Sequence, residues 1–220
     1  MLEVSLPHFA CEDQAGPAHG ASAHLPIGPG VFIAVVGPSG AGKDTLINLA
    51  RNMLQNRPAG AETQFARRVI TRAADASAED HDTMDEAAFA AAEAAGRFSV
   101  TWRAHGLSYG LPAEIDRIIA DGGVVVANSS RAALAAISGR FENVVVVQVT
   151  APRDKLAERL AARGRETRDD ILARLERATL VADLPGSVIV ENKGHPGEAA
   201  GKLIAVIEKA AARAALSGLV

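Results

Sequence analysis

The chain has 220 residues, of which 23 are Lys or Arg and 26 are Asp or Glu, so its formal net charge is -3. This length suits one domain, or one domain with a small insert, and is long enough to bury a substantial core. The mildly acidic balance gives no reason to expect a broad basic surface for nucleic acid, and a single cysteine excludes an internal disulfide or a cysteine metal cluster.

The sequence also lacks the features of a membrane or secreted protein. No apolar run approaches the roughly 20 residues that are needed to span a bilayer. The first residues have neither the basic start nor the continuous apolar stretch of a signal peptide, and sparse cysteine is typical of a reducing compartment. We therefore expect a cytoplasmic protein without a membrane partner.

From residue 31 onward, the chain alternates between short apolar runs and longer amphipathic segments. Residues 1–30 contain several prolines and no periodic pattern, which predicts a flexible leader before a domain over 31–220. Continuous apolar runs indicate strands that are covered on both faces, and their alternation with helices predicts the α/β class with a parallel sheet flanked by helices. The expected strands are 31–36, 124–128, 144–149 and 187–191. The expected helices are 43–56, 85–96, 112–121, 130–138, 153–163, 168–181 and 197–215.

The segment 65–111 differs in character from the rest of the domain. It contains an arginine-rich stretch, a polar turn, the alanine-rich helix and the only Trp and Tyr of the chain. Because it lies between the first two buried runs, we expect a small insert that carries substrate contacts. His81 and His105 lack metal-ligand spacing and are expected to be surface or hydrogen-bonding histidines rather than catalytic residues.

A glycine-rich loop follows the first predicted strand and precedes a predicted helix. Such a loop turns backbone N–H groups toward an anion, the helix N-terminus adds a partial positive charge, and the lysine reaches the outer phosphates of a nucleotide. We therefore expect a phosphate loop that binds ATP. Its residues are Gly37, Pro38, Ser39, Gly40, Ala41, Gly42 and Lys43.

The residue after the lysine is unusual for such a loop. This position normally holds Ser or Thr, whose hydroxyl ligates magnesium, but here it is Asp44, followed by Thr45. A carboxylate beside a triphosphate is tolerated when Mg²⁺ lies between them, so both residues are candidate magnesium and nucleotide ligands. The alternative is that Asp44 is a favourable acid at a helix N-terminus.

Two groups of arginines are candidates for binding other phosphates. Arg159 and Arg163 are four residues apart and share a helix face, which favours a mobile lid over about 152–178; the alternative is a solvated helix with interleaved acids. Alternation along a strand places Arg68 and Arg72 on one face, where they could clamp an acceptor, and Arg103 follows Trp102 in the same segment.

Several stretches make the chain similar to the guanylate kinase branch of the nucleoside monophosphate kinases. They are "GPSGAGK" at 37–43, "ITR" at 70–72, "HGLSYGLP" at 105–112, "RLAARG" at 159–164 and "VIVENKG" at 188–194. The resemblance implies a P-loop NTPase fold with a small acceptor-binding insert and a helical lid. It assigns the acceptor phosphate to Arg72 and Tyr109. It places Arg159 and Arg163 in the lid, Arg174 on a phosphate, and Asn192 on the adenine-side loop.

Departures from that pattern point to a different acceptor. The acids that read guanine are replaced by Val100-Thr101-Trp102 and by Ala127-Asn128-Ser129-Ser130-Arg131, and neutral or basic groups suit an acceptor with a second phosphate. The stretches "GPSGAGKD", "RRVITR", "AEDH" and "TWRAHGLSYGLP", with "NSSR" at 128–131, resemble the ribose 1,5-bisphosphate phosphokinase family of bacterial phosphonate breakdown. Ser129 stands where that family more often has Gly.

This resemblance implies ATP-dependent phosphorylation of ribose 1,5-bisphosphate to 5-phosphoribosyl 1-diphosphate, with ATP and Mg²⁺. The alternatives are a guanylate or other nucleoside monophosphate kinase, and a catalytically inactive guanylate kinase-like interaction module. The expected partner is a small-molecule substrate and not a nucleic acid, and the sequence is compatible with a homodimer without fixing the oligomeric state. The expected catalytic residues are Lys43, Arg159, Arg163 and Arg174. The expected acceptor residues are Arg68, Arg72, Arg103, Tyr109, Asn128, Ser130 and Arg131.

Overall fold

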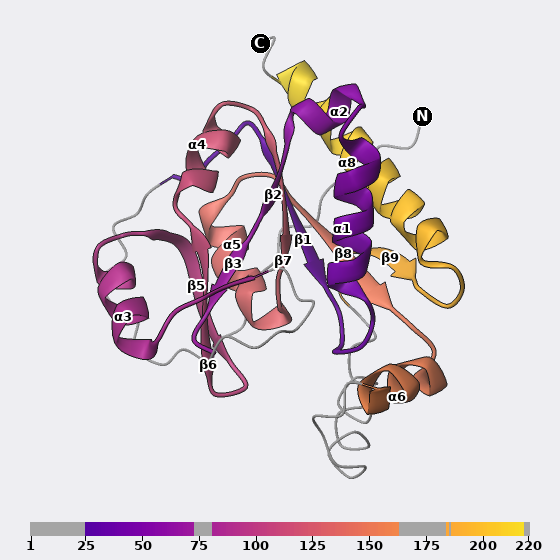
Figure 1. The fold of residues 1–220 in the computed structure, drawn as a ribbon. Helices are drawn as coiled ribbons and strands as arrows, with labels where there is room; N and C mark the ends of the chain where they lie inside the picture. Colours follow the sequence, from indigo (N-terminus) through magenta and orange to yellow (C-terminus); the bar gives the residue numbers. More distant parts are fainter. Residues whose placement is uncertain (1–24, 73–80, 163–183, 185, 218–220) are drawn as a thin grey trace.

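The computed structural model describes residues 25–72, 81–162, 184 and 186–217. Its main sheet has five strands in the order β2-β7-β1-β8-β9, and every neighbouring pair is parallel (Figure 1). The strands are β1 (Val31–Val36), β2 (Thr63–Ala66), β7 (Val124–Asn128), β8 (Val144–Thr150) and β9 (Val188–Glu191). The prediction of a parallel α/β sheet is confirmed.

Helices cover both faces of this sheet because β1 buries side chains on both sides. Ile33 belongs to a core cluster with Leu46 of α1 and Leu203 of α8, whereas Phe32 belongs to a second cluster with Ile119 of α4 and Ile137 of α5. Figure 1 shows α1 and α8 on one side of the sheet and α4 and α5 on the other. The helices are α1 (Lys43–Leu54), α2 (Pro58–Ala61), α4 (Glu114–Ala120), α5 (Leu134–Arg140), α6 (Arg153–Ala162) and α8 (Pro196–Ser217), and the short 3₁₀ helix η1 (Arg131–Ala133) precedes α5.

A second sheet lies beside the first and carries its own helix. Its four strands have the order β4-β3-β6-β5, in which β6 is antiparallel to both β3 and β5. Its buried side chains Val100 and Leu111 belong to the same cluster as Phe32, so its core is continuous with that of the main sheet. The elements are β3 (Arg68–Ile70), β4 (His81–Thr83), α3 (Glu86–Ala94), β5 (Phe98–Ala104) and β6 (Leu107–Pro112).

The structure moves two of the expected boundaries. Ile27 forms a parallel bridge with Phe141, and its backbone N–H donates to the carbonyl of Arg140 at 2.9 Å, so the end of the expected leader is attached to the domain. The segment 63–66 is a strand of the main sheet, although sequence patterns suggested that the insert begins at about residue 65. This strand has four residues and is only partly buried, so its hydrophobic pattern is too short to stand out. The expected leader from 1 to 24 and the expected helix over 168–181 lie outside the described residues.

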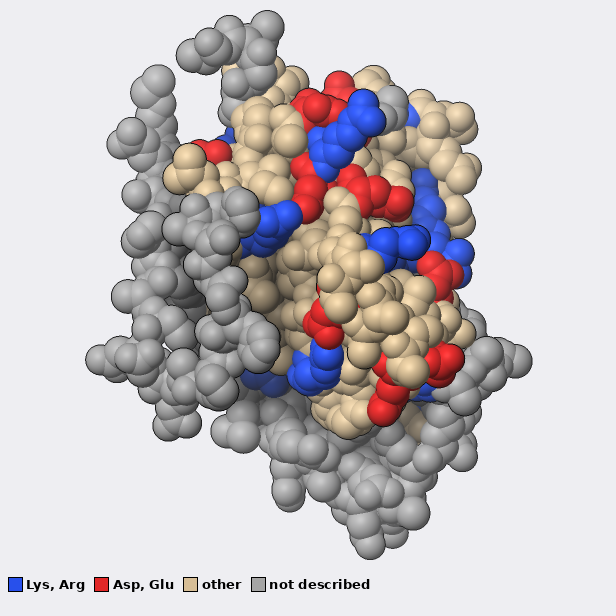
Figure 2. Space-filling view, turned by 90° about the vertical axis from the view of Figure 1, so that its left-hand side faces the viewer, with Lys and Arg blue, Asp and Glu red and all other residues tan. Residues whose placement is uncertain are grey.

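The surface over α3 and α4 carries charges of both signs. Figure 2 shows basic and acidic side chains touching one another on this face, as expected for ion pairs such as Arg117 with Asp121 at 3.5 Å. In the part of the chain that the structure describes, no helix combines the length and the apolar character needed to cross a bilayer.

Candidate active site

A cavity of about 230 Å³ lies at the carboxyl ends of β1 and β7. Ligands of open parallel sheets bind at this edge, where the connections diverge to opposite sides of a strand. The cavity is bordered by the phosphate loop, the start of α1, the residues after β7 and the second sheet. Its polar and aromatic lining side chains are Ser39, Lys43, Asp44, Thr45, Arg68, Arg72, Trp102, His105, Tyr109, Asn128, Ser129 and Ser130.

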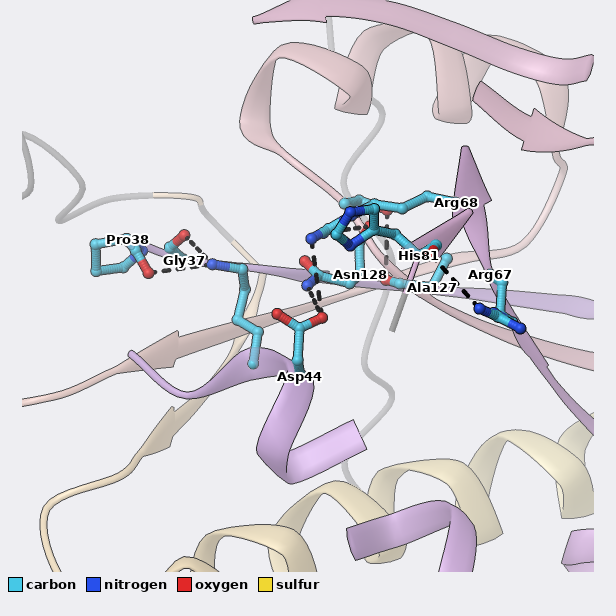
Figure 3. Close-up of polar contacts among 10 residues, drawn as sticks. Gly37, Pro38, Asp44, Arg67, Arg68, His81, Ala127 and Asn128 are labelled. Atoms are coloured by element: carbon cyan, nitrogen blue, oxygen red, sulfur yellow. Dashed lines mark hydrogen bonds and ion pairs between the residues drawn. The ribbon is translucent and has the colours of Figure 1, made fainter. Parts of the chain in front are cut away.

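The loop between β1 and α1 has the backbone conformation that its glycines predict. Gly37, Gly40 and Gly42 have φ angles of 146°, 82° and 90°, a region that other residues enter at a cost. Lys43 Nζ donates to the carbonyl oxygens of Gly37 at 2.8 Å and Pro38 at 3.1 Å (Figure 3). A cation is thereby held against the loop at the N-terminus of α1, where phosphates bind in loops of this kind.

Two predicted site residues, Asn192 of the ATP site and Arg159 of the lid, support the loop from outside the cavity. Asn192 is 2% exposed, and its Nδ2 donates to the carbonyl of Ala41 at 2.9 Å. The Arg159 guanidinium, from α6, donates to the carbonyls of Gly40 and Asn192, both at 3.3 Å. Neither side chain lines the cavity. The structure therefore places both as braces of the phosphate loop, while Arg163 and Arg174 lie outside the described residues.

Asp44 connects the loop helix to the other side of the cavity. Its Oδ1 accepts a hydrogen bond from Asn128 Nδ2 at 2.6 Å and lies 3.8 Å from Arg68 Nη2 (Figure 3). Arg68 Nη1 in turn donates to the backbone carbonyl of Asn128 at 3.4 Å. Sequence reasoning did not find this group, because its members come from three elements that only the tertiary fold brings together.

The second sheet contributes the remaining wall. Arg68, Arg72 and Tyr109 line the cavity, as does Ser130 after β7. Tyr109 pairs with Trp102 across the β5–β6 ladder, and their rings stack with centroids 5.2 Å apart.

Sequence reasoning missed three residues of this wall, Trp102, Ala104 and His105, which also line the cavity. His105 has φ 53°, in the turn between β5 and β6. The short spacing from Trp102 to Tyr109 indicates a hairpin and could have identified the aromatic pair.

Two expected acceptor residues are not in the cavity. Arg103 follows Trp102 on β5, so its side chain points to the opposite face of the strand. Its Nη2 donates to Glu93 Oε2 at 2.8 Å, and the guanidinium lies 5.3 Å from the ring centre of Phe89. Arg131 is exposed at the start of η1 and does not line the cavity. The structure therefore places Arg103 and Arg131 outside this cavity.

Arg103→Ala is accordingly expected to leave the acceptor KM unchanged and to lower the free energy of unfolding by about 1 kcal/mol or less, since the ion pair is exposed. The hydrogen bond from Arg103, followed by that from Thr101, lowers the pKa of Glu93 below its ordinary value of 4.5. A depressed folded-state pKa stabilises the protein above that ordinary value, and this contribution disappears as pH falls through the lowered pKa. Urea unfolding of the wild-type and Arg103→Ala proteins should therefore show a smaller difference in the free energy of unfolding at pH 4 than at pH 7. A raised acceptor KM would return Arg103 to the site.

Comparison with known proteins finds relatives of similar sequence and a solved structure of similar fold. No family model matches the chain. The chain is 48% identical over 191 residues to the ribose 1,5-bisphosphate phosphokinase PhnN of Chelativorans sp. (strain BNC1), an alignment that covers 86% of this chain and 90% of that protein. It is 49% identical over 178 residues to the protein of the same name from Methylobacterium radiotolerans, with 80% and 97% coverage. The crystal structure of guanylate kinase from Anaplasma phagocytophilum superposes with a TM-score of 0.60 at 17% identity, covering 84% of this chain and 88% of that one.

Proposed function

The chain belongs to the ribose 1,5-bisphosphate phosphokinase family, and on that premise we propose that it transfers the γ-phosphoryl group of ATP to ribose 1,5-bisphosphate. The products are 5-phosphoribosyl 1-diphosphate and ADP, and the step belongs to phosphonate breakdown. The observation that carries this proposal is a cavity bordered by the phosphate loop with its lysine, by Arg68 and Tyr109 of the second sheet, and by Arg72, which follows β3.

The reaction makes modest demands on the protein. The acceptor oxygen on the 1-phosphate is already anionic at neutral pH, so no proton has to be removed from it. A bond forms from this oxygen to the γ-phosphorus, and the bond to the β,γ-bridging oxygen breaks, with ADP taking the electron pair. Positioning and charge neutralisation therefore supply the catalysis, in which Lys43 acts on the donor and Arg68 and Arg72 on the acceptor.

The residues at the start of α1 fit a hydrated magnesium ion. The hydroxyl-bearing Thr45 is exposed and lines the cavity together with the Asp44 carboxylate, and both offer the hard oxygen atoms that Mg²⁺ prefers. Over the described ranges, no group of three or more His, Cys, Asp or Glu residues could hold a metal, so phosphates and water would supply most of the ligands. When bound with ATP, the ion would neutralise charge on the β- and γ-phosphates.

We propose that the second sheet binds the acceptor and that the rest of the domain binds ATP. The proposed acceptor substrate is a small sugar phosphate. Because the donor is ATP, we place the reaction in the cytoplasm, where this nucleotide is available. The roles of Arg163 and Arg174 on the transferring phosphoryl group rest on the sequence resemblance.

A coupled assay with purified protein, ATP and Mg²⁺ tests the assignment against its alternatives. Ribose 1,5-bisphosphate should be phosphorylated at least about a hundredfold more efficiently than GMP or AMP, because a site that pairs charged groups with a second phosphate rejects ligands that lack it. Ribose 5-phosphate lacks the accepting phosphate and should give no diphosphate product in one step. Turnover of GMP with none of ribose 1,5-bisphosphate would make the protein a guanylate kinase. Failure to bind ATP in calorimetry would indicate an inactive interaction module.

A further inference from the structure

Asp44, Arg68 and Asn128 form a closed group of polar contacts between the two substrate sides of the cavity. Asp44 belongs to the first turn of α1, Arg68 begins β3 and Asn128 ends β7. The carboxylate touches both other side chains, and the guanidinium touches the backbone of Asn128. The side chains of Asp44 and Arg68 are 19% and 12% exposed, so these charges are largely shielded from water.

The chemistry of the three groups determines how they are oriented. A carboxylate only accepts hydrogen bonds, so Asn128 must present its NH₂ group to Asp44. Its Oδ1 consequently faces away from Asp44, and this buried atom has no hydrogen-bond partner among the described residues. A shielded carboxylate also favours a cation beside it, and the Arg68 guanidinium lies there. Asp44 therefore fixes the direction of the amide and holds one guanidinium nitrogen of Arg68.

We propose that Asp44 is a positioning residue, which acts through Arg68 and Asn128 to set the acceptor side of the cavity from the helix that carries the phosphate loop. The proposal rests on the proposed function, because the acceptor is taken to be a sugar phosphate that Arg68 contacts. It gives a reason for a carboxylate next to the triphosphate. Its Oδ1 holds Asn128 and Arg68 on the acceptor side of the cavity. The positive charge of Arg68 reduces the repulsion between this carboxylate and the phosphates.

Two other roles for Asp44 make different kinetic predictions. A helix-terminal acid would contribute stability through the helix dipole, with no preference for either substrate. A magnesium ligand would change the Mg²⁺ concentration needed for half-maximal rate, and enough Mg²⁺ would restore the variant. A positioning residue instead raises the acceptor KM even when ATP and Mg²⁺ are saturating.

The test compares Asp44→Asn with the wild-type protein at saturating ATP and Mg²⁺. Asparagine keeps the shape of the side chain and removes its charge, so we expect the KM for ribose 1,5-bisphosphate to rise about tenfold, as for one lost charge-assisted contact. The KM for ATP should change by less than about threefold, because the lost contacts affect only the acceptor side of the cavity. Glu86→Gln is the matched control, since Glu86 is an exposed acid in the first turn of α3, outside the cavity, and it should change neither constant.

A double-mutant cycle separates a specific coupling from a general disturbance. In an Arg68→Ala background, Asp44→Asn should raise the acceptor KM by less than about threefold, because one of the two residues through which Asp44 acts is gone and only its contact with Asn128 remains. Asp44→Ser, which supplies the hydroxyl common in such loops, is a second variant and should show the same acceptor effect; thermal unfolding checks that each protein is folded.

An unchanged acceptor KM in both folded variants, a defect that high Mg²⁺ abolishes, or full additivity with Arg68→Ala would each overturn the proposal. A wild-type protein that does not phosphorylate ribose 1,5-bisphosphate would instead contradict the proposed function, so the two failures are distinguishable.

Discussion

Lys43→Ala is expected to lower kcat/KM by about a thousandfold, since the lysine is the charge that meets the phosphates in the transition state. Its ammonium donates to two backbone carbonyls of the loop, Gly37 and Pro38. These contacts lie at a partly buried surface position outside both core clusters. The melting temperature should therefore shift by no more than about 2 °C. Steady-state kinetics and thermal unfolding are the measurements.

Lys202→Ala provides the matched control for this prediction. Lys202 is an exposed lysine on α8 and does not line the cavity, so the same substitution there should leave both kinetics and melting unchanged. Retention of more than about a tenth of the wild-type activity in Lys43→Ala would contradict a role in transition-state stabilisation. Loss of cooperative unfolding would show that Lys43 is required for the fold.

Gly42→Ala is expected to damage the loop from within. Gly42 has φ 90°, and a Cβ atom added to it would lie 2.5 Å from Asn192 Nδ2. Alanine in this region costs about 1–2 kcal/mol, and displacing the buried Asn192 amide from its bond to Ala41 costs about another 1 kcal/mol. We expect the free energy of unfolding to fall by about 2–4 kcal/mol. The kcat/KM for ATP should fall about a hundredfold, because a small displacement of the loop misplaces the donor phosphates.

Gly96 offers a control that separates the two causes. Its φ is also positive, at 66°, but an added Cβ would meet no heavy atom within 4 Å. Gly96→Ala should therefore carry only the backbone cost of about 1–2 kcal/mol and leave the kinetics unchanged. Equal destabilisation in the two variants would mean that the contact with Asn192 does not matter. Combining Gly42→Ala with Asn192→Ala should recover part of the extra loss, since the clashing amide is removed.

Much of the fold could be predicted because its signals are local in the sequence. The buried run 31–36 and the phosphate loop that follows it need only a hydrophobic pattern and the conformational freedom of glycine, and both occur where expected. The resemblance also named Arg72 and Tyr109, which the structure brings to the cavity. Strand β2 was missed because four residues, none of them fully buried, form too short a hydrophobic pattern.

The parts of the site that could not be predicted depend on contacts between distant segments. Asp44 and Asn128 are 84 positions apart, and nothing in the local sequence of either residue indicates the other. Arg103 was assigned to the acceptor site because it follows Trp102, but neighbours on a strand face opposite ways. Once Trp102 is known to stack on Tyr109, the outward direction of Arg103 follows. Asn192 and Arg159 were expected at substrates, but they hold backbone carbonyls of the loop, a use that motif matching does not reveal.

The strand order of the main sheet constrains how the chain can fold. Strand β7 lies between β1 and β2, so the first two strands of this sheet are not hydrogen-bonded to each other. Their shared partner, β7, follows all strands of the second sheet and α3 in the sequence. The antiparallel pair of β5 and β6 can close early, because a short turn joins its strands, whereas parallel pairing across long separations is slow. During synthesis, β1 and the phosphate loop that follows it therefore cannot pair with β7 until residue 128 has emerged. The strands of the second sheet, which form the other wall of the cavity, are the first part of the site able to pair.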